Sequence, residues 1–144
     1  MEHKICGWVK LNDLQYLDYH NNEWGKPLHN DNALFELFSL ETQSSGLSWL
    51  TVLKKRDGYR KAFKNFSLET VASYTQEDIN RIFESGLIIK SRPKIEAIIN
   101  NAKLFLEIKK EFASLDNYFW SKVNHKTIIN DVLDYKIACT KSEI

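Results

Sequence analysis

The chain has 144 residues, of which 43% are hydrophobic and 27% charged, and its formal net charge is +1 at pH 7. This composition is that of an average globular protein and is too apolar for an intrinsically disordered chain. No apolar run approaches the roughly 18 residues of a membrane span, and the N-terminal residues lack the apolar core of a signal peptide. Two cysteines, Cys6 and Cys139, are too few for a disulfide scaffold. We therefore exclude membrane, secreted and fibrous classes and expect a reducing, cytoplasmic setting.

The charges are unevenly distributed along the chain. Residues 1–50 carry three Lys against seven acidic residues, whereas residues 54–64 carry six basic residues against one acid. A second basic stretch contains Lys90, Arg92 and Lys94. A polyanion would therefore contact the middle of the chain. The same charges would equally suit a solvated helix face.

Residues 1–30 show no clean hydrophobic period, and we expect loops and short turns there. A helix is predicted to begin at Asn30 or Asp31, because an apolar stripe follows that includes Leu34, Phe35, Leu37, Phe38 and Leu40. Ser48 can cap a second helix, in which apolar residues recur from Trp49 to Phe66 at helical spacing. Gly58 lies within that stretch and weakens the prediction of one continuous helix.

The second half of the chain has clearer helix boundaries. Thr75 and Asp78 have the spacing of a capping box at the start of a helix, which is predicted to stop at Ser85-Gly86. Pro93 suits the first turn of the next helix, whose apolar face runs from Ile95 to Leu106, and a last helix is expected around residues 115–123. With five Gly and two Pro in all, few turns of a β-sandwich are possible. We predict an all-α fold, a compact helical bundle forming one domain over residues 1–144.

Glu41 is the most informative single residue. On a helical wheel it falls about 20° from Leu34 and about 40° from Leu37. A carboxylate within an apolar stripe must be paired, protonated, or offered to a cationic or hydrogen-bonding ligand. Glu41 could equally accept backbone N–H bonds from the loop at residues 43–49, so the wheel alone leaves both readings open.

Aromatic residues are concentrated in the first 50 residues: Trp8, Tyr16, Tyr19, Trp24 and Trp49. Indole and phenol rings stack on purine faces and attract a cationic ring. Each ring taken singly suits a helical core equally well, but the group favours a pocket of the size of a nucleobase.

Two further groups of residues could carry a function. Cys6 and His20 are zinc-ligand types, as are the distant His125 and Cys139, but their spacing is not a finger pattern. The predicted helix–turn–helix at residues 79–105 places Gly86 and the basic side chains of Lys90, Arg92 and Lys94 around one turn. Such a unit can hold a phosphate without reading sequence, or it is an ordinary helical hairpin.

Several segments taken together resemble the 3-methyladenine DNA glycosylase I family: Cys6-Gly-Trp8, Tyr19-His20-Asn-Asn-Glu-Trp24-Gly25, and Leu40-Glu41 with Gly46-Leu-Ser-Trp49. The stretches at residues 51–56, 59–60 and 120–124 extend the likeness, which runs from about residue 4 to the end of the chain.

The resemblance implies a fold of the helix–hairpin–helix DNA-repair superfamily and hydrolysis of the N-glycosidic bond of 3-methyladenine in double-stranded, alkylated DNA. By position, Glu41 would bind the base edge, Tyr19 and Trp49 would stack around the base, and Trp8 and Trp24 would complete the pocket wall. We expect a monomer. No Lys is placed as a Schiff-base nucleophile, so we expect no strand cleavage.

The family also holds a structural zinc, whose first two ligands match Cys6 and His20. Family members continue into a further segment with a second His/Cys pair, which neither His125 nor Cys139 matches, so we expect a C-terminally truncated chain with an incomplete zinc ligand set. Pro93 stands where related hairpins commonly have Gly. The alternatives are a truncated, non-catalytic helical DNA-binding or interaction protein, and a zinc-stabilised helical module without a nucleic-acid role.

Overall fold

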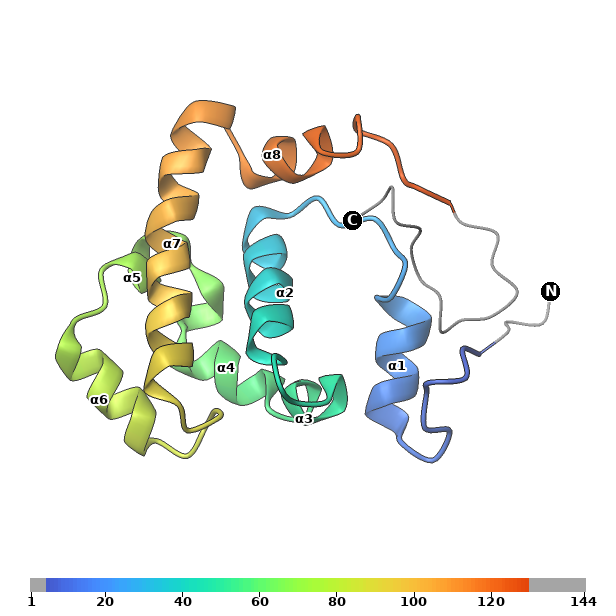
Figure 1. The fold of residues 1–144 in the computed structure, drawn as a ribbon, viewed down its shortest axis with the longest axis horizontal. Helices are drawn as coiled ribbons and strands as arrows, with labels where there is room; N and C mark the ends of the chain where they lie inside the picture. Colours follow the sequence, from blue (N-terminus) through green and yellow to red (C-terminus); the bar gives the residue numbers. More distant parts are fainter. Residues whose placement is uncertain (1–4, 130–144) are drawn as a thin grey trace. The chain divides into compact units, whose positions relative to one another are not determined.

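The computed structural model describes residues 5–129, and within that range the regular structure is helical, with no strand (Figure 1). Cys139 lies outside the described residues. The chain divides into two compact units. The first contains the residues up to Pro27 and those from Lys126 onward, and the second is Leu28–His125. None of the helices in the described range is both long and apolar enough to span a membrane. The expectation of a single domain over residues 1–144 stays a prediction.

The first unit contains helix α1 (Leu14–Asn22). Asp13 caps it by accepting a hydrogen bond from the Tyr16 N–H at 3.0 Å, and its buried side chains are Tyr16, Tyr19 and His20. The prediction of loops and short turns throughout residues 1–30 is therefore wrong. The buried face of α1 is aromatic and polar instead of aliphatic, so it carries no strong hydrophobic period.

The second unit begins with α2 (Asp31–Gln43), α3 (Trp49–Leu53), α4 (Arg56–Ala62) and the short 3₁₀ helix η1 (Lys64–Phe66). The predicted caps are confirmed, because Asn30 accepts from the Ala33 N–H at 2.9 Å and Ser48 accepts from the Thr51 N–H at 3.2 Å. The stretch from Trp49 to Phe66 is three short helices in place of one. It breaks first between Leu53 and Arg56, whereas Gly58 lies inside α4.

The unit continues with α5 (Leu68–Ala72), α6 (Gln76–Glu84), α7 (Arg92–Phe112) and α8 (Leu115–Ser121). The capping box of α6 is confirmed: the Thr75 N–H donates to Asp78 Oδ2 at 2.8 Å, and the Asp78 N–H donates to Thr75 Oγ1 at 3.4 Å. Pro93 lies in the first turn of α7 as predicted. These boundaries could be predicted because each has a local chemical signal.

One apolar core holds the second unit together, and α7 packs against α2, α5, α6 and α8 in it (Figure 1). The predicted face of α7 is buried from Ile95 to Phe105. Phe35 and Leu40 of α2 are fully buried against it, and each such side chain contributes about 1.5–3 kcal/mol of burial free energy. The core therefore fixes the two helices that carry Glu41 and the basic hairpin.

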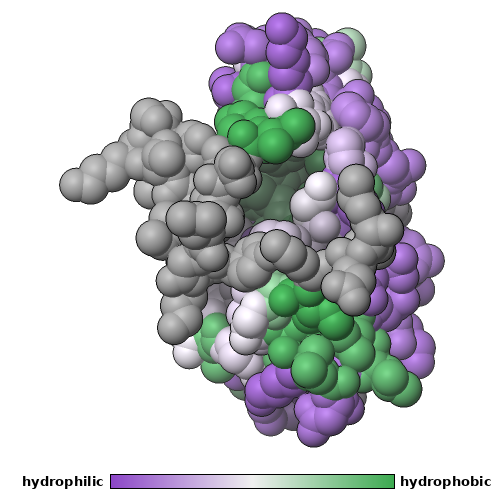
Figure 2. All heavy atoms as spheres, turned by 90° about the vertical axis from the view of Figure 1, so that its right-hand side faces the viewer, coloured by the Kyte–Doolittle hydropathy of each residue, from purple (hydrophilic) through white to green (hydrophobic). Residues whose placement is uncertain are grey.

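Apolar side chains also reach the surface. Figure 2 shows hydrophobic surface gathered in patches on one face of the molecule, between hydrophilic areas. In the first unit, the exposed large apolar side chains are those of Ile5, Leu11, Leu14, Trp24, Ile128 and Ile129. In the second unit, Leu47 is 42% exposed on the loop that follows α2.

Candidate base-binding and nucleic-acid site

Glu41 lies in the last turns of α2 and is exposed to water. The prediction that this carboxylate is buried within an apolar stripe is therefore wrong. The buried face of α2 instead comprises Phe35, Glu36, Ser39, Leu40 and Gln43. Leu34 and Leu37, from which the position of Glu41 was measured on the wheel, are only half-buried. The helical wheel placed Glu41 on the same side of α2 as Leu34 and Leu37. That side is the edge of the buried face and not its centre.

The Glu41 carboxylate has no hydrogen bond and no ion pair with any residue in the described range. Its alternative role, accepting backbone N–H bonds from the loop at residues 43–49, is absent there too. Although the side chain is exposed, the surrounding protein displaces enough water to raise the pKa of its carboxyl above the ordinary value. An acid that is partly desolvated and uncommitted is a candidate ligand-binding group.

The buried acid of α2 is Glu36, which is 9% exposed. Its Oε1 accepts from Arg56 Nε at 3.3 Å, and it also pairs with Arg60. The sequence signal missed this cluster, because all three residues look like ordinary surface charges. Two of the six basic residues in the 54–64 stretch are thus paired with Glu36, which leaves fewer of them for an external polyanion.

Gln43 occupies the end of the buried face of α2 and is 1% exposed. The Tyr59 hydroxyl donates to Gln43 Oε1 at 2.9 Å, and Gln43 Nε2 donates to the Lys94 carbonyl at 3.0 Å. Burial raises the pKa of Tyr59 to about 12, so this hydroxyl keeps its proton and remains a donor. Sequence reasoning missed Gln43 because a polar residue was not counted in the apolar stripe.

Lys94 completes this network from α7. Its Nζ donates to the carbonyls of Gln43 at 2.6 Å and Ser45 at 2.8 Å. The ammonium therefore ties the first turns of α7 to the loop after α2. The prediction that Lys94 contacts DNA is not tested by this geometry, but at least two of its three donors already have partners.

The turn between α6 and α7 carries the other predicted phosphate-binding residues. Gly86 has φ +71°, a conformation that favours glycine. Arg92 and Lys90 lie over the ring of Phe83, at 4.4 Å and 4.9 Å from its centroid. Arg92 Nη1 also donates to Asn80 Oδ1 at 2.6 Å. The two cations are thus held beside the turn and the N-terminus of α7, which is where an anion is favoured.

An aromatic cluster lies within the first unit. Trp8 contacts the rings of Tyr16, His20 and Trp24, with centroids 5.2, 5.4 and 5.5 Å apart. His20 stacks on Trp24 at 5.8 Å and 12°. The structure therefore brings together the two predicted wall residues, Trp8 and Trp24. Tyr19 is a buried residue of α1, the helix that also carries Tyr16 and His20.

The two predicted zinc ligands are adjacent. The Cys6 N–H donates to His20 Nε2 at 3.3 Å, and His20 Nδ1 is 2.9 Å from Asn21 Oδ1. Burial raises the pKa of the Cys6 thiol, because removal of water disfavours the thiolate. Residue types and proximity fit half of a structural zinc site, but among residues 5–129 no group of three or more His, Cys, Asp or Glu side chains could hold a metal ion.

The predicted site residues are thus divided between the two units. Trp8, Tyr19, Trp24 and the Cys6–His20 pair belong to the first, and Glu41, Trp49 and the hairpin belong to the second. Trp49 is half-buried and packs against the core of its unit.

Comparison with known proteins assigns the chain. Residues 8–144 match the family model described as methyladenine glycosylase. This chain belongs to the methyladenine glycosylase family. It is 45% identical over 139 residues to a DNA-3-methyladenine glycosylase from Haemophilus influenzae, an alignment that covers 96% of this chain and 75% of the relative.

Solved structures of the family agree. A crystal structure of 3-methyladenine DNA glycosylase I shares 38% identity at a TM-score of 0.89, covering 94% of this chain and 74% of that one. A variant of 3-methyladenine DNA glycosylase I in complex with 3-methyladenine shares 44% identity at a TM-score of 0.78, covering 80% of this chain and 62% of that one. The all-α prediction and the predicted family resemblance are both confirmed.

Proposed function

We propose that this chain hydrolyses the N-glycosidic bond of 3-methyladenine in DNA, releasing the free base and leaving an abasic site. Its relative is named a DNA-3-methyladenine glycosylase, and a solved family member is bound to 3-methyladenine. The observation in this chain that carries the proposal is Glu41. It is an exposed carboxylate with a raised pKa and no hydrogen-bond or ion-pair partner in the described range.

The chemistry asked of such a site is recognition more than bond breaking. Methylation at N3 makes the purine cationic, so its bond to the sugar is already weak. The base must first leave the stack, at a cost of a few kcal/mol. A carboxylate beside aromatic rings then favours a flat cation over neutral adenine through charge and stacking. In our proposal Glu41 binds the base edge and Tyr19 and Trp49 stack on the base, while Trp8 and Trp24 form the pocket wall.

The hairpin serves the DNA backbone in this proposal. Gly86 and the N-terminus of α7 would hold a phosphate, with Lys90 and Arg92 supplying charge, as in a helix–hairpin–helix unit. Contacts of this kind position a duplex without reading its sequence. The partner is then double-stranded DNA containing alkylated bases. The enzyme would act as a monomer in the reducing, cytoplasmic compartment that its few cysteines suit.

We further propose a structural zinc held in part by Cys6 and His20. Their adjacency supports this, and they are the two ligands of the four that the sequence identifies. Zinc would stabilise the first unit and take no part in base release. The test is the metal content of the purified chain by elemental analysis. Stoichiometric zinc that is lost in Cys6→Ser supports the proposal. A purified chain that contains no zinc, and whose melting temperature does not change when zinc is added, contradicts it.

The activity is tested by incubating the chain with methylated duplex DNA and separating the released bases by chromatography. We expect free 3-methyladenine, and no covalent adduct on treatment with borohydride. Duplex binding without base release would contradict the enzymatic proposal and identify a non-catalytic DNA-binding protein instead. Trapping of an adduct would overturn the expectation of a purely hydrolytic reaction.

A further inference from the structure

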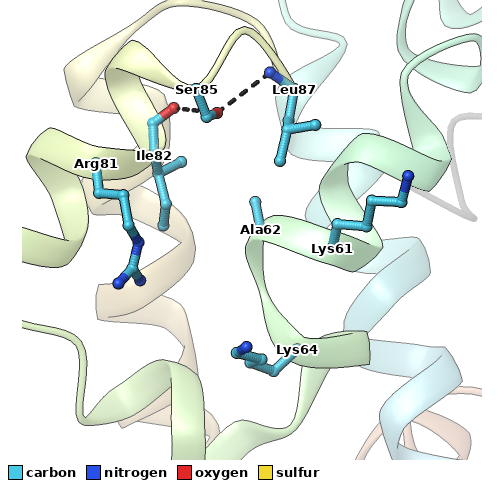
Figure 3. A pocket seen from close by; sticks show the side chains of 7 residues that line it. All are labelled: Lys61, Ala62, Lys64, Arg81, Ile82, Ser85 and Leu87. Atoms are coloured by element: carbon cyan, nitrogen blue, oxygen red, sulfur yellow. Dashed lines mark hydrogen bonds between the residues drawn. The ribbon is translucent and has the colours of Figure 1, made fainter.

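A second cationic surface lies beside the hairpin, in a hollow of about 310 Å³. Figure 3 shows its two walls: Lys61 comes from α4 and Lys64 from η1 on one side, and Arg81 comes from α6 on the other. Ala62 and Ile82 form an apolar floor between them. No acidic side chain lines this hollow.

The cations of the hollow are available, unlike others in the basic stretches. Lys61 and Lys64 are exposed and form no ion pair with any residue between 5 and 129. Arg81 forms one, through Nη2 to Asp78 Oδ1 at 2.8 Å, which leaves its other N–H groups free to donate. This contrasts with the Arg56 and Arg60 side chains held by Glu36.

Ser85 stands at the rim but adds no free polar group. Its hydroxyl donates to the Ile82 carbonyl at 2.6 Å and accepts from the Leu87 N–H at 3.2 Å (Figure 3). The attraction of this hollow for a ligand is therefore the charge of its three cations. Such a surface selects an anion.

The backbone at Lys64 is held in an unusual conformation. Lys64, Asn65 and Phe66 have φ values of 49°, 51° and 57°, and a non-glycine residue in this left-handed region costs about 1–2 kcal/mol. The fully buried rings of Phe63 and Phe66 anchor the turn at both ends. Backbone that is held in such conformations is concentrated at binding sites.

Lys64 lines a second hollow as well as the first. Lys61 and Lys64 border a neighbouring hollow of about 620 Å³, which Asp57, Arg60 and Asn65 also line. The two lysines therefore form a ridge between two hollows. A chain of regularly spaced negative charges could cross that ridge and remain in contact with cations on both sides.

We propose that Lys61, Lys64 and Arg81 bind neighbouring backbone phosphates of the DNA duplex, next to the phosphate held at the α6–α7 turn. The inference rests on the proposed function, since it extends the same DNA surface. The hollow reaches Ser85 and Leu87 on either side of Gly86, so a strand lying on the turn continues into it. The hollow offers positive charge but no free polar group that could read a base edge, and such a surface suits the sugar–phosphate backbone.

The test is the salt dependence of duplex binding by the full chain. The variant Lys61→Ala/Lys64→Ala is compared with Lys103→Ala/Lys110→Ala, which removes two exposed lysines of α7. The probe is an undamaged 25-base-pair duplex titrated at several salt concentrations, with circular dichroism confirming the fold of each variant. Each lost phosphate contact reduces the slope of log K against log [salt] by about 0.9.

We expect the first variant to lose about one phosphate contact and to bind about tenfold more weakly at low salt, and the α7 variant to keep the wild-type slope. Arg81→Gln should lower the slope in the same direction. Equal slopes for the two lysine pairs, in a chain that releases 3-methyladenine, would overturn the phosphate site and leave the proposed function intact. A wild-type chain that binds no duplex at any salt concentration would overturn both.

Discussion

Gly58 of α4 lies directly against the carbonyl of Leu87 in the α6–α7 turn. A Cβ atom at position 58 would come within 1.9 Å of the Leu87 oxygen and 2.8 Å of its carbonyl carbon. Both are backbone atoms, so no side-chain rotation can relieve the overlap. Glycine at this position lets α4 touch the hairpin turn, and this contact fixes Lys61, on the same helix, beside the predicted phosphate site.

Gly58→Ala is therefore expected to destabilise the protein by about 1–3 kcal/mol, because the turn and the helix must move apart. Denaturant unfolding measures the change. Gly7→Ala is the matched control, since a Cβ at Gly7 meets nothing within 4 Å, and it should stay within about 0.5 kcal/mol of the wild type. If both variants were equally stable, the close approach of α4 to the turn would be wrong.

Glu41→Gln should impair excision of 3-methyladenine at least tenfold, a loss of about 1.4 kcal/mol in transition-state binding. The variant keeps the shape of the side chain and loses the charge that favours a cationic base. Duplex binding should be nearly unchanged, because one side chain contributes little to contacts with the backbone. Steady-state base release measures excision, and duplex titration measures DNA binding. If Glu41→Gln excised 3-methyladenine at the wild-type rate, Glu41 would not be the base-binding group.

Glu36→Gln tests the other acid of α2, which is buried and paired with arginine whereas Glu41 is exposed. Replacing Glu36 removes the carboxylate charge that pairs with Arg56 and Arg60, and breaking a buried pair costs about 3–5 kcal/mol. We expect a large loss of stability in thermal or denaturant unfolding, and excision by the remaining folded fraction close to the wild-type rate. An outcome in which Glu36→Gln abolishes excision without affecting stability would place the functional carboxylate at Glu36.

The raised pKa of Glu41 predicts a pH dependence of both stability and activity. The folded state holds this proton more tightly than the unfolded state. Stability therefore falls as pH rises from the ordinary value, 4.5, through the higher folded pKa. Excision has the opposite trend, because the charged carboxylate is the binding form and is lost as pH falls through the same folded pKa.

Two measurements check this linkage. The melting temperature of Glu41→Gln should exceed that of the wild type at pH 7, and the difference should vanish at a pH below 4.5. The acidic limb of kcat/KM assigned to this group should disappear in the variant. A variant that is less stable than the wild type at pH 7 would mean that the carboxylate has a stabilising partner.

The helix boundaries in the second half of the chain were predictable because their signals are local. Thr75 with Asp78, Gly86 and Pro93 each act within one helical turn. The position of Glu41 was not predictable, since the wheel cannot say which flank of α2 the rest of the chain covers. The pairing of Glu36 with Arg60 and the contact of Gly58 with Leu87 join residues 24 and 29 positions apart. No periodic pattern reports such contacts, and only the packed fold reveals them.

The network at the end of α2 gives a last prediction. Lys94→Met keeps the aliphatic stem but removes the donors to the carbonyls of Gln43 and Ser45, so the loop at residues 44–48 should loosen and stability should fall by about 2 kcal/mol. Excision should weaken, whereas the salt slope of duplex binding should stay at the wild-type value, because an ammonium committed to two carbonyls neutralises no phosphate.

Lys90→Met, at an exposed cation of the same hairpin, is the control and should lower the slope by about 0.9 with little change in stability. If Lys94→Met instead lowered the slope and left the melting temperature unchanged, Lys94 would be a DNA contact as the sequence alone predicted.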